Sequence, residues 1–366
     1  MNINTNVSKD DLKFKSEVYD KMSTLYLSDS ITNLTNAFRD NPNYVNVPSI
    51  IANNVTECTS AFKNDINLIS VGKINFPNCS NYQSMFQDCF NLKILPINSE
   101  NVKNDAIYTF IFQNCYNLHD NIYNINITNC NLASAFHNCG ITKINNLTAI
   151  NCNFHNTFYG CNDLMSIENM VINCNDDNNL LFSTFNSCSN LTDISNVTFA
   201  GNVRLICIFQ GCYNLVNISN LNIDTAKQIN AMFWRCNNLT TIPNLNTSNV
   251  TSMASTFQYC YNLVDVPQLN MSNVIDAHNM FLDCDNLSNN SYANIANSLP
   301  LANNLTNYYI SNIGLNVSKF DYDQLVILNS KGYIDAIPIP PSPEKLTYYN
   351  IYYNTNDEVV DGGGEI

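Results

Sequence analysis

The sequence has little charge and little glycine. Charged residues make up 13% of the 366 residues, and only ten residues are glycine. No glycine-rich phosphate loop, dinucleotide fingerprint or serine–histidine–aspartate order stands out, so we expect no enzyme activity and no cofactor. The formal net charge of −14 argues against nucleic acid and against docking on anionic lipid, because both need clustered lysine and arginine.

Long apolar stretches are also missing. No apolar run reaches about 18 residues, so we expect no membrane insertion. The first residues, MNINTNVSKDDLKFKSE, show no secretory signal, which predicts a protein made in the cytoplasm. In such a chain, fifteen cysteines predict free, buried thiols rather than a disulfide framework.

What the sequence has is repetition. Phe233, Cys236 and Leu239 recur 24 residues later as Phe257, Cys260 and Leu263. Eleven anchor phenylalanines share this pattern: Phe38, Phe62, Phe86, Phe112, Phe136, Phe158, Phe185, Phe209, Phe233, Phe257 and Phe281. A period of this length with leucine-like positions predicts a leucine-rich-repeat solenoid of about eleven coils.

Each repeat divides into a turn and a strand. The turn, short helical or irregular, ends in Phe and Cys, and the Leu-x-x-Ile/Val-x-x-Leu part forms a strand. Stacking then places the strands about 4.8 Å apart in one parallel sheet. Pro48, Pro96, Pro243 and Pro267 share one position, which we expect at the strand's end because proline donates no hydrogen bond. A recurrent asparagine between Cys and Leu, such as Asn91 or Asn238, is predicted to be a left-handed corner residue.

The cysteine row allows a metal site, a disulfide chain or a packed ladder. Zinc needs ligands that converge, and a disulfide needs Cβ atoms about 3.8 Å apart, whereas stacking places these about 4.8 Å apart and parallel. We therefore predict a structural ladder and no metal; its members include Phe86, Cys89, Phe112, Cys115, Cys188, Cys212, Cys236, Cys260 and Cys284. Cys130 and Cys152 share another offset and are expected to stack. His137 with His155, and Asp176 with Asp177, are poorly placed for metal binding.

The chain is predicted to have four parts. Residues 1–30 form an N-terminal helical cap, 31–288 the solenoid, 289–336 a helical C-terminal cap, and 337–366 a Pro-rich linker with an extended tail. Within the cap we expect helices at 291–299, 301–313 and 321–331, with Gly314 and Gly332 at helix ends. The tail is a strand on a partner's sheet edge, a strand on its own cap, or disordered.

Candidate binding residues lie beside the strand region. Aromatic residues follow four ladder cysteines, and one repeat carries the only tryptophan; the candidates are Phe90, Tyr116, Tyr213, Tyr261, Trp234, Thr240, Thr241 and Asp265. These rings either cover the coil edges and pack together, or bind a protein or a cell-surface glycan.

The phrase NLNTSNVTSMASTFQYCYNLVDVPQLNMSNV resembles the BspA-like leucine-rich-repeat family, over about residues 31–288. That resemblance implies a surface adhesion and recognition protein. The segment beginning SYANIANSLP resembles phage tail-associated proteins of low-GC Gram-positive hosts, which implies a virion protein contacting the host surface, with a structural partner bound through residues 337–366. The alternatives are a purely structural particle component and a cell-surface adhesin.

Overall fold

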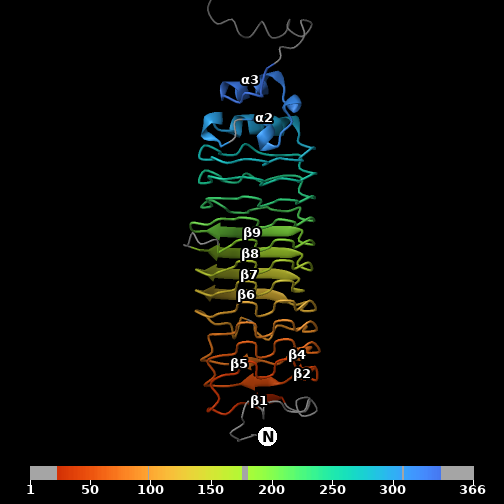
Figure 1. Cartoon of the computed structure of the whole chain (residues 1–366), viewed down its shortest axis with the longest axis vertical. Coiled ribbons are helices and arrows are strands. Elements are labelled where there is room, and N and C mark those ends of the chain that lie inside the picture. The colour runs from red at the N-terminus through yellow and green to blue at the C-terminus, as the bar shows by residue number, and fades with distance from the viewer. Residues whose placement is uncertain (1–22, 98, 175–179, 307–308, 339–366) are drawn as a thin grey trace, which may run out of the picture.

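The chain winds into one long stack of coils, with helices over its C-terminal end (Figure 1). This computed structural model describes residues 23–97, 99–174, 180–306 and 309–338. The strands are β1 (Thr24–Tyr26), β2 (Asn46–Val47), β3 (Ser49–Ile51), β4 (Ser70–Val71), β5 (Ile74–Asn75), β6 (Asn121–Thr128), β7 (Lys143–Ile150), β8 (Ser166–Asn173) and β9 (Asp193–Ala200). The helices are α2 (Asn289–Ser298) and α3 (Tyr322–Ser330), with 3-10 turns at Ala302–Asn304, Ser311–Ile313 and Val317–Lys319.

All strand pairs in the described residues are parallel and join equivalent positions of successive coils. In the largest sheet, β6, β7, β8 and β9 lie side by side in that order. Two smaller sheets, β1-β3-β5 and β2-β4, lie toward the N-terminal end. The predicted leucine-rich-repeat solenoid is confirmed.

The prediction of one sheet running through eleven coils is wrong, because in the described residues regular strands occupy seven turns and form three separate sheets. Proline explains much of the difference, since it has no N–H to donate to the neighbouring coil. The long strands β6 to β9 contain no proline, whereas Pro48 separates β2 from β3, at a strand end as predicted. The coils with Pro243 and Pro267 form no regular strand there in the described residues, and the isolated bridge Thr241↔Asp265 pairs them.

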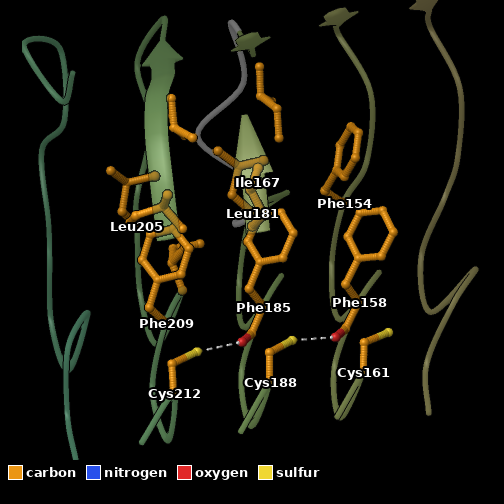
Figure 2. Close-up of a cluster of buried hydrophobic side chains, with 14 of the residues drawn as sticks. Phe154, Phe158, Cys161, Ile167, Leu181, Phe185, Cys188, Leu205, Phe209 and Cys212 are labelled. Atoms are coloured by element: carbon orange, nitrogen blue, oxygen red, sulfur yellow. Dashed lines mark hydrogen bonds between the residues drawn. The ribbon is translucent and has the colours of Figure 1, made fainter. Parts of the chain in front are cut away.

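The anchor phenylalanines form a continuous stack through the interior. Ten successive pairs connect all eleven rings, with centroids 4.6–5.9 Å apart and nearly parallel planes. Figure 2 shows Phe158, Phe185 and Phe209 in this arrangement. Offset stacks of this kind contribute about 0.5–1.5 kcal/mol per pair beyond area burial.

The ladder thiols lie beside these rings and are hydrogen bonded. Cys188 Sγ donates to the carbonyl of Phe158 at 3.1 Å and Cys212 Sγ to that of Phe185 at 3.2 Å (Figure 2). The same bond to the anchor carbonyl of the preceding coil is made by Cys89, Cys115, Cys161, Cys236, Cys260 and Cys284. Each of these anchor carbonyls already accepts the backbone N–H three residues further on, so the thiol adds a second hydrogen bond as well as filling space.

All fifteen cysteines are free, and fourteen are buried. Burial raises the pKa of the ladder thiols, to about 12 for Cys161 and for Cys260, so they stay protonated and unreactive. Cys130 and Cys152 meet, with the backbone N–H of Cys130 donating to Cys152 Sγ at 3.3 Å.

Two left-handed residues shape the turn of every coil. They lie two residues before and two residues after each anchor phenylalanine, for example Ser255 and Tyr259 around Phe257. The asparagines predicted to be left-handed, such as Asn91 and Asn238, do not have positive φ. Their amides instead bond to the previous coil: Asn91 Nδ2 donates to the Ile66 carbonyl at 2.8 Å and Asn238 Nδ2 to Asn214 Oδ1 at 3.1 Å.

The two ends of the chain differ in what can be described. Of the predicted N-terminal helical cap at 1–30, residues 1–22 lie outside the described residues, and Thr24–Tyr26 is the strand β1, paired with β3, rather than helix. Of the predicted linker and tail at 337–366, residues 339–366 lie outside the described residues. At the C-terminal end, 3-10 turns replace the helix predicted at 301–313. Gly314 and Gly332 have φ of 86° and 92°, the left-handed geometry expected of glycines that end a helix.

Asp65 is buried at the ladder position that cysteine occupies in later coils. Its Oδ1 accepts the backbone N–H of Asn41 at 2.7 Å, while Oδ2 has no partner among the described residues. Burial raises the pKa of Asp65 to about 8, the Asn41 hydrogen bond opposes the rise, and the Asp40 carboxylate adds to it. The core therefore stabilises the protonated acid.

Asp65→Asn should stabilise the protein at high pH only. Between about pH 4, where an unfolded aspartate titrates, and about pH 8, folded Asp65 keeps a proton that the unfolded chain has lost, so wild-type stability falls as pH rises. Urea unfolding should show the variant more stable by on the order of 5 kcal/mol at pH 8 and equal at pH 4. The exposed Asp224→Asn serves as control, and equal stabilities at pH 8 would contradict the argument.

Candidate functional site

All candidate residues except Trp234 lie on one corner of the stack. We call it the corner surface and define it as the positions four to eight residues after each anchor phenylalanine. Aromatic rings occur at the first of these positions in two separate groups. Phe90 and Tyr116 stack on each other at 5.6 Å, as expected of rings that cover coil edges. Gly140 then interrupts the row; a Cβ there would lie 2.3 Å from the Tyr116 carbonyl oxygen.

The second group, Tyr213 and Tyr261, is exposed to a similar degree as Phe90 at 37% and Tyr116 at 50%, but its two rings do not stack on each other. Tyr213 is 42% exposed and Tyr261 44% exposed, and Tyr261 contacts only the ring of Tyr259, at 6.0 Å, among the described aromatic side chains. The nearby side chains form a shallow groove across four coils, lined by Val216, Asn238, Thr240, Asn262, Val264 and Asn286. Val216 is 52% exposed, so the floor offers apolar surface between amide and hydroxyl groups.

Thr240, Thr241 and Asp265 also lie on the corner surface with exposed side chains. Their backbones hold neighbouring coils together: the Thr240 carbonyl accepts the N–H groups of Val264 at 2.9 Å and Asp265 at 3.1 Å. Ser288 Oγ donates to Asp265 Oδ1 at 3.3 Å, which ties this carboxylate to the start of the C-terminal cap. Thr240 thus lines the groove, while Asp265 has a structural partner.

Trp234 belongs to an aromatic–arginine cluster, made of Trp234, Arg235 and Tyr259, beside the corner surface. The guanidinium carbon of Arg235 lies 4.3 Å from the Trp234 ring centroid and 5.3 Å from that of Tyr259. The two rings meet edge to face at 5.5 Å. Asn237 supports the cluster, since its amide donates to the carbonyls of Arg235 at 3.2 Å and Tyr259 at 3.1 Å in the orientation that satisfies its neighbours.

Arg235 and Tyr259 were not predicted, although the sequence holds a signal for them. Both occupy the left-handed position two residues after the anchor phenylalanine, with φ of 61° and 63°. The other nine coils have Asn, Asp, Ser or Gly there: Asp40, Asn64, Asp88, Asn114, Asn138, Gly160, Ser187, Gly211 and Asp283. Bulky residues are disfavoured in this conformation, so two adjacent coils carry a local cost at this position. At the other left-handed position the bulky residue is Phe110, with φ of 58°.

The histidines have ordinary neighbours. The His137 ring lies 4.9 Å from Tyr159 and that of His155 5.4 Å from Phe182. Partial burial lowers the pKa of His137. Within residues 23–97, 99–174, 180–306 and 309–338, no group of three or more His, Cys, Asp and Glu side chains is placed to hold a metal ion. Asp176 and Asp177 lie outside these ranges.

The fold and the corner surface define the class of protein: a leucine-rich-repeat solenoid that presents aromatic and polar side chains along one corner. Residues 32–150 and 203–308, more than half of the chain, match the family described as "Mycoplasma protein of unknown function, DUF285", and the chain belongs to this family. The match supports the predicted repeat family and does not support the resemblance to phage tail proteins.

Other comparisons are more distant. A leucine-rich repeat protein of known structure from Bacteroides ovatus is 15% identical, with 69% of this chain and 85% of that protein covered and a TM-score of 0.28. No curated protein matches. None of the helices in the described part of the chain is long and apolar enough to span a bilayer.

The positive φ of Arg235 leads to a prediction about the free energy of unfolding. Arg235→Asn and Arg235→Ala both remove the guanidinium contacts, but asparagine tolerates positive φ better. Urea unfolding should therefore find the Asn variant more stable by about 1 kcal/mol. The same pair of substitutions at Thr240, which does not have positive φ, should show no such preference. If the Ala variant proved as stable as the Asn variant, the claim that the backbone at residue 235 is strained would be contradicted.

Proposed function

We propose that the protein is a non-enzymatic recognition module that binds a cell-surface glycan or protein through the corner surface of the coils of Phe209 to Phe281. The observation that carries the proposal is the groove, whose lining residues Asn238 and Asn286 donate hydrogen bonds to the backbone carbonyls of the exposed Tyr213 and Tyr261. Half-exposed rings and valines gathered on a regular stack are typical of an interaction site, because tyrosine contributes strongly to interfaces.

The position of this surface also suits binding. Stacked coils fix the spacing of side chains on neighbouring turns, so the groove is preformed and loses little freedom when a partner binds. The asparagines along it are already ordered by bonds between coils, as when Asn262 Nδ2 donates to the Asn237 carbonyl at 2.8 Å. Their remaining carbonyl groups are available to a polar ligand.

A place in a phage virion, and a structural partner for residues 337–366, stay predictions from the sequence. Residues 339–366 lie outside the described part of the chain. Recognition by the corner surface depends on neither, since the groove is built from residues 216–286 alone.

Binding of the full-length protein to intact host cells tests the proposal. We expect saturable binding that falls by about tenfold or more in the double variant Tyr213→Ala, Tyr261→Ala, because these exposed rings belong to residues whose backbone carbonyls bond to the groove asparagines. The matched control is Phe90→Ala, Tyr116→Ala, which removes two exposed rings from the other group and should bind like the wild type. The proposal would be overturned by the absence of saturable binding, or by an equal loss of binding in both double variants. Treatment of the cells with periodate or with protease then separates glycan from protein partners.

A further inference from the structure

The aromatic–arginine cluster holds a cation without a carboxylate partner in a strongly acidic protein. The chain has a net charge of −14, yet no carboxylate among the described residues forms an ion pair with Arg235. Its side chain is exposed and lies against Trp234 and Tyr259 rather than extending into solvent. A stacked guanidinium loses little freedom on binding and keeps its N–H edge free for an anion.

The backbone under this cluster indicates that the residues are present for a purpose other than stability. At this position of the turn, two residues after the anchor phenylalanine, nine coils have Asn, Asp, Ser or Gly, and only the coils of Phe233 and Phe257 have bulky residues, Arg235 and Tyr259. Disfavoured backbone conformations of this kind concentrate at binding and active sites. Here the two exceptions are neighbours, and they place a cation and a ring in contact.

The cluster also adjoins the groove. Tyr261 follows Tyr259 by two residues and contacts its ring at 6.0 Å, and Asn262 and Asn238 line the groove directly beyond. A guanidinium, a half-exposed ring and a line of amides and hydroxyls therefore follow one another along the corner. This order matches a ligand with a negative charge at one end, a C–H-rich face in the middle and hydroxyl groups at the other.

We infer that the surface from Arg235 across Tyr261 to Asn262 binds a carboxylated sugar residue of a glycan. The carboxylate pairs with the Arg235 fork, the sugar ring lies on Tyr261, and the hydroxyls reach the groove asparagines. A sugar fits better than an acidic peptide because three side-chain amides and the Thr240 hydroxyl line the groove beside the apolar surface of Val216 and Val264, which suits the mixed polar and C–H surface of a sugar. The backbone N–H groups of Val264 and Asp265 at its edge are already bonded between coils and are not free for a peptide. The inference rests on the recognition function proposed above and names its ligand class.

The chain provides its own reporter, since Trp234 is the only tryptophan and lies in the cluster. Fluorescence of the full-length protein is titrated with 3′-sialyllactose and with a glucuronic-acid-terminated disaccharide. Lactose and the methyl esters of the two acids are the uncharged controls. At least one acid should change the emission saturably, with affinity about tenfold or more above that of its ester, because the ester cannot form the charged pair.

Two variants at Arg235 distinguish the planar guanidinium group from its positive charge. Arg235→Asn keeps a residue suited to the turn, and Arg235→Lys keeps the positive charge without the planar fork; each should weaken acid binding by about tenfold or more while far-UV circular dichroism stays unchanged. Tyr261→Ala should also weaken it. Tyr116→Ala, which removes an exposed ring from the other group, should not.

Several outcomes would overturn the inference. They are no response to either acid, equal binding of acid and ester, and unchanged binding in Arg235→Asn. A response to a polyglutamate peptide or a sugar phosphate in place of the carboxylated sugars would do the same. If cells still bind through Tyr213 and Tyr261 while both acids fail, the ligand class is wrong and the recognition function stands.

Discussion

Ring-on-ring stacking of the anchor phenylalanines is the contact that sets the geometry of this protein. Each coil touches only its neighbours, so stability accumulates along the stack rather than around one central core. A coil that slipped by one residue would lose its ring contact, its thiol bond and its strand pairing together. The three ladders therefore reinforce one register, as Phe185, Cys188 and Ile194 illustrate in a single coil.

That register leaves the corner surface free to vary. Interior positions repeat the same residue types, whereas the position after the ladder cysteine changes from Phe90 and Tyr116 to Gly140 and then to Tyr213 and Tyr261. The two left-handed positions in each turn are constrained by the backbone and still depart from the rule at Arg235 and Tyr259. The exposed Tyr213 and Tyr261 and the bulky left-handed residues Arg235 and Tyr259 all lie in the coils of Phe209 to Phe257, whereas Phe110 is a bulky left-handed residue in an earlier coil.

The interior could be predicted from the sequence because its signal repeats eleven times. Phenylalanine and cysteine spacing is enough to place rings and thiols in line, and Tyr213 and Tyr261 could be placed on the surface by their offset. The length of the strands could not be predicted, because the period of the leucine-like positions does not reveal that Pro243 and Pro267 lack a backbone N–H to donate. Asn91 was misassigned because asparagine suits both a left-handed turn and a side-chain hydrogen bond, and here the bond decides.

The mapping of native thiol reactivity tests the central claim, the in-register stack, most directly. Iodoacetamide is applied to the folded protein under non-reducing conditions, and the labelled cysteines are located by mass spectrometry before and after denaturation. The account predicts that Cys207, which is partly exposed, reacts first, while Cys188, Cys212 and Cys236 react only after unfolding. Rapid labelling of these ladder thiols in the native protein, or their recovery as disulfides, would contradict it.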